Sequence, residues 1–170
     1  MSSIYKINRS VAQNLATAYM DSPVGLLEVQ CTEGGLQSVN FVEKRQFEEN
    51  PNAYNQLTIN QLKEYFDRKR TSFDLLFDLE GTDFQKRVWT ELLNIPFGKT
   101  RSYMEQSKAL GDVKAIRAVA SANGQNKIVI IIPCHRVIGS DGSLTGFAGG
   151  LHRKKWLLEF ETPPVQGELF

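Results

Sequence analysis

The residues with the clearest chemical potential are a cysteine and a histidine, adjacent in the segment Pro133-Cys134-His135-Arg136-Val137. A thiolate is a strong nucleophile, but a free cysteine has a pKa of about 8.5, so only a few per cent is thiolate at neutral pH. A nearby histidine acting as a base raises that fraction, and a carboxylate or amide must orient the histidine. The pair predicts a nucleophilic cysteine, although many free cysteines simply pack in a core.

The other cysteine, Cys31, lies in a strand-like segment without a neighbouring base, and we predict that it is a core residue. The two cysteines are far apart in the chain, and the remaining histidine is His152. This pattern supports neither a disulfide framework nor the ligand spacing of a structural zinc site. We therefore expect free thiols in a reducing compartment, and no metal.

The elements around Cys134 must hold it in place. The run 128–132 consists of β-branched apolar residues and predicts a buried strand leading into Pro133. Further upstream, apolar residues recur on one face of an expected helix that Thr82 or Asp83 can cap: Phe84, Val88, Trp89, Leu92 and Leu93.

Two further helices are expected between these elements. Ser102 and Glu105 form a capping-box pattern that opens a helix ending at Gly111, and Asp112 is placed to cap a second helix over 113–122. Two short helices joined by a Gly-Asp turn fit a helix-turn-helix, and they fit an ordinary helical hairpin as well.

The second of these helices carries small residues together with an arginine: Ala115, Arg117, Ala118, Ser121 and Ala122. A face of small residues can bring the helix backbone close to a narrow partner such as the DNA minor groove, where proteins often insert a side chain. The alternative from spacing alone is that the alanines pack against a neighbouring helix.

The charge distribution separates the two halves of the chain. The net charge is +1, but residues 1–84 carry 8 Lys/Arg against 12 Asp/Glu, and residues 85–170 carry 12 Lys/Arg against 7 Asp/Glu. A basic second half beside an acidic first half suggests that only the second half meets a polyanion such as nucleic acid.

The first half has the pattern of a small α+β domain without a chemical motif. The segment 26–42 predicts two strands joined by a turn at Glu33-Gly34-Gly35, and 73–79 predicts a closing strand. Between them, apolar residues at roughly helical spacing predict a helix: Leu57, Leu62, Tyr65 and Phe66. We place the domain boundary at Gly81-Thr82-Asp83, giving domains 1–81 and 82–170.

Several features favour a cytoplasmic protein. No apolar run approaches the roughly 20 residues of a membrane helix, and the segment 1–10 lacks the apolar stretch of a secretory signal. We expect a monomer that does not bind membranes.

The segment Ile132-Pro133-Cys134-His135-Arg136-Val137 resembles the active-site signature of the O6-alkylguanine-DNA alkyltransferases, the methylated-DNA–protein-cysteine methyltransferases. The resemblance extends from about Thr82 to Glu161. It is carried by further motifs in the same order: Arg101-Ser102-Tyr103, Ala115-Ile116-Arg117-Ala118-Val119, Ala122-Asn123-Gly124-Gln125-Asn126 and Gly146-Phe147-Ala148-Gly149-Gly150-Leu151. The first half is similar to the family's first domain less specifically, at Asp21-Ser22-Pro23-Val24-Gly25 and Gly35-Leu36.

The resemblance implies an α+β protein with a small, ribonuclease-H-like N-terminal domain and a helical, winged helix-turn-helix-like C-terminal domain. It implies that the protein flips O6-alkylguanine out of double-stranded DNA and transfers the alkyl group irreversibly to its own cysteine, without a cofactor. O4-alkylthymine is a further candidate substrate. Each molecule would act once, because the product is a thioether.

The resemblance also assigns the residues that act on the alkyl group and the base. Cys134 would accept the alkyl group, His135 would take the thiol proton through a water, and Glu161 would orient His135. Asn126 would brace the reactive segment, and Tyr103 would donate to the departing guanine.

Other residues would contact the DNA or the flipped base. Arg117 would fill the gap left by the extruded nucleotide, and four more residues would face the DNA: Ala118, Ser121, Ala122 and Arg136. The pocket for the base would be formed by Val137, Phe147, Ala148 and Gly149.

Three positions depart from the commonest family pattern. Lys127 replaces a proline, Phe147 replaces a tyrosine and Ala148 replaces a serine found in some members. These changes bear on substrate range and rate.

Two other functions remain as alternatives: a lesion sensor that binds alkylated DNA without transferring the group, and a thiol hydrolase acting on an acyl substrate. A hydrolase would need an oxyanion hole that the sequence does not identify.

Overall fold

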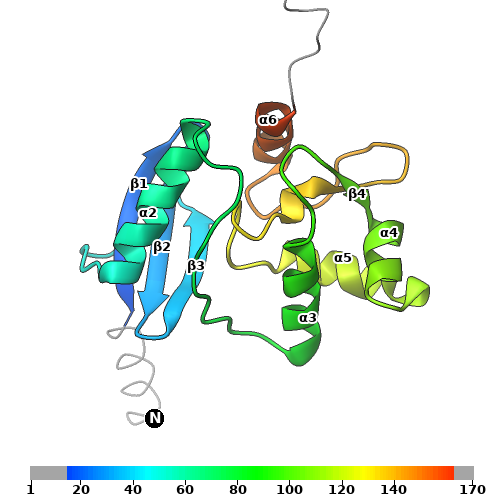
Figure 1. The fold of residues 1–170 in the computed structure, drawn as a ribbon, viewed down its shortest axis with the longest axis horizontal. Helices are drawn as coiled ribbons and strands as arrows, with labels where there is room; N and C mark the ends of the chain where they lie inside the picture. Colours follow the sequence, from blue (N-terminus) through cyan, green and yellow to red (C-terminus); the bar gives the residue numbers. More distant parts are fainter. Residues whose placement is uncertain (1–14, 163–170) are drawn as a thin grey trace, which may run out of the picture. The chain divides into compact units, whose positions relative to one another are not determined.

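The computed structural model describes residues 15–162 (Figure 1). The chain divides into two compact units, Met1–Glu80 and Gly81–Phe170. The outermost parts of the two expected domains, 1–14 and 163–170, lie outside the described residues, as does the segment examined for a secretory signal. Within 15–162, no helix is long and apolar enough to cross a membrane.

The first unit contains an antiparallel sheet of three strands in the order β1-β2-β3. The strands are β1 (Ala16–Ser22), β2 (Gly25–Thr32) and β3 (Gly35–Phe41). The predicted hairpin is confirmed, and Gly35 is required at its end because φ is +143° and a Cβ would lie 2.5 Å from the Leu76 carbonyl oxygen. Strand β1 was not predicted from the sequence; its first five residues are all buried, so it lacks the alternation between buried and exposed residues that marks a half-buried strand.

Helix α2 (Ala53–Phe66) lies across one face of this sheet (Figure 1). The amphipathic pattern predicted this helix. A reciprocal capping box between Asn52 and Asn55 fixes where it begins, at Ala53. The buried Asn55 amide then donates to the carbonyls of Ala16 (3.0 Å) and Val29 (2.9 Å), which fastens the helix to β1 and β2.

The strand predicted over 73–79 is wrong. This segment makes one isolated parallel bridge, between Phe77 and Leu36. The Leu36 amide donates to the Leu76 carbonyl, and the Leu36 carbonyl accepts from the Asp78 amide, both at 2.8 Å. In the described residues the pairing does not extend beyond these two hydrogen bonds into a strand ladder. Apolar residues predicted a strand here, but only a short stretch of the segment reaches β3.

The second unit is mainly helical and comprises α3 (Asp83–Leu92), α4 (Tyr103–Ala109), α5 (Ile116–Gly124) and α6 (Leu151–Glu161). The capping predictions are confirmed, because Thr82 caps α3, and Ser102 with Glu105 forms the capping box of α4. Asp112 caps a 3-10 turn, Val113–Ala115, which leads directly into α5. The expected second helix therefore begins as a tighter turn and ends two residues later than predicted.

The predicted strand over 128–132 is also wrong. All five residues are buried, but the chain folds into tight turns in which the Ile131 amide donates to the Val129 carbonyl at 2.8 Å. Ile130 has φ of +72°, a conformation that a β-branched residue rarely adopts and that costs energy. An apolar run signals burial, and burial alone does not distinguish a strand from a compact loop.

We predict that Asn55→Ala loosens the first unit, because it leaves two buried carbonyls and the Asn52 amide without their partner. The expected loss is about 2 kcal/mol, equivalent to about 30-fold faster transient opening. The labelling rate of Cys31, which is fully buried, measures that opening in a Cys134→Ala background. Gln56→Ala, at an exposed position of the same helix, is the control; equal labelling rates in both variants would contradict the role of Asn55.

Candidate active site

Cys134 begins a short 3-10 helix, Cys134–Arg136, directly after the buried turns. It is 7% exposed. The Asn126 side chain holds the preceding segment together: its amide donates to the Ile132 carbonyl (2.8 Å) and to Cys134 Sγ (3.3 Å), and its oxygen accepts from the Ile128 amide (3.0 Å). Asn126 thus supplies the hydrogen bonds that a neighbouring strand would otherwise give, and it fixes the position of the sulfur.

A parallel strand pair connects this segment to the start of α4. Strand β4 (Arg101–Ser102) pairs with β5 (Val137–Ile138), with Arg101 opposite Val137. Tyr103 directly follows β4 and is the first residue of α4. Two short strands therefore tie the tyrosine to the chain that carries the cysteine, although 30 residues separate them.

His135 is fully buried and contacts the Glu161 carboxylate, with Nε2 2.9 Å from Oε2. Burial raises the pKa of Glu161, but hydrogen bonds from His135 and Arg136 outweigh it and lower the pKa to about 2. An ionised carboxylate only accepts hydrogen bonds, so Nε2 carries the proton. The other nitrogen, Nδ1, is buried without a hydrogen-bond partner and is free to accept a proton.

Arg136 has a different place from the one predicted. It is 5% exposed, and its guanidinium makes a bidentate contact with Glu161: Nε to Oε1 at 2.8 Å and Nη2 to Oε2 at 2.9 Å. Its remaining nitrogen donates to the Ile95 carbonyl at 2.7 Å. A side chain so engaged is not available to a DNA phosphate, so we correct the predicted DNA contact: Arg136 holds Glu161.

Lys154, which is fully buried in α6, was not predicted as a site residue. Its ammonium donates to the Thr145 carbonyl at 2.8 Å and lies 5.8 Å from the centre of the Tyr103 ring. Burial lowers the pKa of Lys154, while the proximity of Cys134 raises it. The signal was available in the sequence, because Lys154 and Glu161 are seven residues apart and therefore share one face of a helix.

These charges act on the cysteine and histidine in different ways. Burial raises the pKa of Cys134, whereas the Asn126 hydrogen bond and the Lys154 charge lower it; the net direction is upward, so the resting group is a thiol. Burial lowers the pKa of His135 and outweighs the upward effect of Glu161, so the resting imidazole is neutral. At rest, Cys134 is therefore a thiol and the adjacent His135 a neutral imidazole.

Tyr103 faces the loop that precedes α6. Its hydroxyl donates to the Thr145 carbonyl at 3.0 Å, and the Thr145 hydroxyl donates to the tyrosine oxygen at 3.2 Å. Of the four residues predicted to line a base pocket, Val137 is fully buried, Gly149 is buried, Phe147 is half-buried and Ala148 is exposed. Arg153 donates to the Gly149 carbonyl at 3.1 Å, which ties this loop to α6.

The predicted DNA-facing residues of α5 do not all share one face. Arg117, Ala118 and Ser121 are exposed. Ala122 is 2% exposed, and its carbonyl accepts a hydrogen bond from the Trp89 indole at 2.8 Å. We therefore correct the prediction for Ala122, which packs toward α3.

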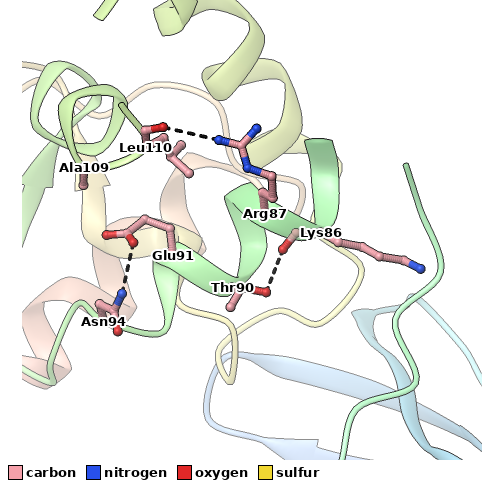
Figure 2. Close-up of a pocket in the computed structure, with 7 residues that line it drawn as sticks. All are labelled: Lys86, Arg87, Thr90, Glu91, Asn94, Ala109 and Leu110. Atoms are coloured by element: carbon pink, nitrogen blue, oxygen red, sulfur yellow. Dashed lines mark hydrogen bonds between the residues drawn. The ribbon is translucent and has the colours of Figure 1, made fainter. Parts of the chain in front are cut away.

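A cavity of about 470 Å³ lies elsewhere in this unit, between α3 and the end of α4 (Figure 2). Its lining residues are Lys86, Arg87, Thr90, Glu91, Asn94, Ala109 and Leu110. Many of its polar groups already pair within the chain: Arg87 donates to the Leu110 carbonyl, and the Asn94 amide donates to Glu91 (Figure 2). Its lining contains no pair of a nucleophile and a neighbouring general base comparable to Cys134 and His135.

Among residues 15–162 there is no cluster of three His, Cys, Asp or Glu side chains suited to a metal.

The second unit thus combines a buried thiol, a histidine paired with a carboxylate, and two short helices, α4 and α5, joined by a turn. Residues 15–79 match the 6-O-methylguanine DNA methyltransferase, ribonuclease-like domain, and residues 83–163 match the DNA binding domain of the same family. The chain belongs to the 6-O-methylguanine DNA methyltransferase family. The expected fold class is thereby confirmed.

Individual relatives agree with this assignment. The chain is 44% identical to a methylated-DNA–protein-cysteine methyltransferase of Mycobacterium tuberculosis over 88% of this chain and 94% of the relative. It is 46% identical to that of Methanosarcina barkeri over 84% of this chain and 94% of the relative. The crystal structure of Mycobacterium tuberculosis OGT in complex with DNA has a TM-score of 0.77 and 45% identity, covering 86% of this chain and 92% of that one.

We predict that Glu161 makes the second unit sensitive to acid. Because its pKa in the folded protein, about 2, lies below the ordinary 4.5, its stabilising contribution is complete above pH 4.5 and is lost as the pH falls toward 2. The shift corresponds to a contribution of about 3 kcal/mol. Urea unfolding followed by tryptophan fluorescence measures it, since both tryptophans, Trp89 and Trp156, lie in this unit.

Glu161→Gln should be less stable at pH 7 and should lose less further stability down to pH 2 than the unchanged protein. Glu159→Gln, at an exposed position two residues away, is the matched control and should keep the original pH dependence. The same acid profile in both variants would show that Glu161 is not the sensitive group.

Proposed function

We propose that Cys134 is the alkyl acceptor in the DNA repair reaction of this family, that its substrate is O6-alkylguanine in double-stranded DNA, and that each molecule reacts once. The observation that carries this assignment is the contact from Glu161 to the Nε2 of His135, which leaves the buried Nδ1 to act as the base, in the residue that follows the buried Cys134. The residue-level roles below follow from that arrangement.

Proton transfer from the thiol is the first step. No direct hydrogen bond joins Cys134 and His135, so we propose that a bridging water carries the proton from Sγ to Nδ1. The thiolate that forms is stabilised by the Asn126 amide and the Lys154 charge, and the imidazolium is stabilised by Glu161. Positioned acid–base groups of this kind typically accelerate a reaction about 10²–10⁴-fold.

Alkyl transfer then proceeds as a displacement at carbon. The sulfur forms a bond to the alkyl carbon while the bond from that carbon to guanine O6 breaks, and the electron pair passes to guanine. Tyr103 donates a proton, so the base leaves neutral. The step leaves His135 as an imidazolium and Tyr103 as a phenolate; the imidazolium then releases its proton to solvent and solvent returns one to Tyr103, so in total one proton passes from the thiol to guanine and no cofactor enters the balance. The thioether product contains no group that this site could displace, which makes the reaction stoichiometric.

The base must leave the helix before the sulfur can reach it, at a cost of a few kcal/mol. We propose that the exposed residues of α5, Arg117, Ala118 and Ser121, face the minor groove. The two small residues allow close approach, and the arginine fills the gap and offsets part of the extrusion cost. In this proposal residues 82–170 carry both DNA binding and alkyl transfer, and the chain acts as a monomer.

The two alternative functions predict different chemistry. A lesion sensor binds alkylated DNA and gains no mass, and a thiol hydrolase turns over an ester repeatedly. The presence of Cys134, His135 and Glu161 in one connected, buried site favours transfer over sensing. O4-alkylthymine remains a further candidate substrate in the proposal.

We predict that excess duplex DNA containing O6-methylguanine adds one methyl group to each protein molecule, located on Cys134. Intact mass and peptide mapping measure the number and the position. Cys31 is an internal control, because it is fully buried and its pKa is raised to about 12 by burial. Cys134→Ala should gain no mass. Unmodified Cys134 in the folded protein after exposure to this DNA would refute the proposal.

We predict that Arg117→Ala slows repair of duplex DNA by about tenfold, equivalent to about 1.4 kcal/mol, and changes the reaction with free O6-benzylguanine less than twofold. Only the duplex requires an extruded base to be held in place. Lys114→Ala removes a positive charge from an exposed position just before α5 and is the matched control, with a smaller effect on duplex repair. Equal losses on both substrates for Arg117→Ala would exclude the gap-filling role.

A further inference from the structure

Thr145 contacts Tyr103 through two different groups. The Thr145 carbonyl accepts the tyrosine O–H at 3.0 Å, and the Thr145 hydroxyl lies 3.2 Å from the tyrosine oxygen, to which it can donate. The same carbonyl accepts from the Lys154 ammonium at 2.8 Å. One loop residue therefore meets both polar side chains that flank the reactive segment, and neither composition nor periodicity indicated it.

The two contacts have different consequences for the tyrosine. A phenol has a single proton to donate and further capacity to accept. In the structure that proton is donated to the Thr145 carbonyl. The tyrosine O–H bond must therefore rotate away from this carbonyl before Tyr103 can donate to a base. The contact from the Thr145 hydroxyl is unaffected by this turn, because it ends on the tyrosine oxygen. Lys154 continues to satisfy the carbonyl that the tyrosine leaves.

From this geometry we infer that Thr145 is a positioning residue for alkyl transfer, whose hydroxyl holds the Tyr103 oxygen while Tyr103 gives its proton to the departing guanine. The inference rests on the proposed function. As the sulfur–carbon bond forms and the carbon–oxygen bond breaks, the tyrosine proton moves to guanine. The tyrosine oxygen then carries negative charge and accepts a stronger, charge-assisted hydrogen bond from Thr145. Solvent returns a proton to Tyr103 after the base has left.

The stabilisation falls mainly on the transition state, since the hydrogen bond strengthens only as charge develops. An interaction of this kind changes the rate of the chemical step and leaves substrate binding nearly unchanged. A purely structural role, such as holding the loop over the site, would change binding as well and would not depend on the tyrosine hydroxyl. These two expectations separate the roles experimentally.

The test uses two replacements of Thr145 in the full chain. Thr145→Val keeps the shape, the β-branch and the carbonyl that Lys154 uses, but removes the hydroxyl. Thr145→Ser restores it. We expect the single-turnover rate of alkyl transfer from duplex O6-methylguanine to fall about tenfold in the valine variant and to recover to within about threefold in the serine variant. Affinity for the same DNA, measured in a Cys134→Ala background, should change less than twofold.

The decisive measurement is the same replacement in a Tyr103→Phe background. If Thr145 acts through the tyrosine oxygen, Thr145→Val has no further effect there, because the atom it positions is gone. A full additional tenfold loss in that background, or equal rates for the valine and serine variants, overturns the inference. Circular dichroism verifies folding, and Thr145→Ala replaces the valine variant if that protein does not fold.

This inference and the proposed function fail in different ways. If the unchanged protein transfers no methyl group to Cys134, the proposed function is wrong and the role of Thr145 falls with it. If the unchanged protein transfers the group and Thr145→Val transfers it at the same rate, only the role of Thr145 is wrong.

Discussion

The Glu161 carboxylate is the contact on which the rest of the site depends. A charged group that is 2% exposed is costly unless it is fully paired, and here one carboxylate binds both His135 and the bidentate guanidinium of Arg136. The same contact fixes which histidine nitrogen carries the proton. Through the Arg136 bond to the Ile95 carbonyl, it also joins the end of α6 to the segment after α3. One buried charge cluster thus joins separate segments of the unit and also fixes the protonation of His135, on which the proposed proton transfer depends.

The reactivity of Cys134 follows from opposing influences on the thiol. Burial raises its pKa and keeps the resting sulfur protonated, which would protect a residue that the proposed reaction uses only once. The Asn126 hydrogen bond and the Lys154 charge act in the other direction and stabilise the thiolate once it forms. A site with burial alone would be inert, and a site with a strongly lowered pKa would expose a reactive thiolate to oxidation and to other alkylating agents.

Local patterns in the sequence predicted α2, α3, α4 and most of α5, but not α6. Thr82, Ser102 and Asp112 each cap the helix or turn expected of them, because capping depends on residues within one turn. The run 128–132 and Arg136 were predicted wrongly for one reason: their structure depends on residues that are distant in the sequence. The 128–132 run is organised by the Asn126 side chain, and Arg136 is withdrawn from the surface by Glu161, 25 residues away. For Lys154 the local signal was only its seven-residue spacing from Glu161, because its partners, Thr145 and Cys134, come from other segments.

Helix α6 carries two charged residues, Lys154 and Glu161, that act on the pKa values of Cys134 and His135. Lys154 and Glu161 lie two helical turns apart, so they present opposite charges to the site from one face of one helix. Lys154 lowers the pKa of both Cys134 and His135, which favours the thiolate but opposes the imidazolium. Glu161 raises the pKa of His135, although burial keeps the net direction downward. In the proposed reaction a thiolate and an imidazolium form, and α6 supplies one charge of opposite sign for each, Lys154 and Glu161, both already fixed in the fold.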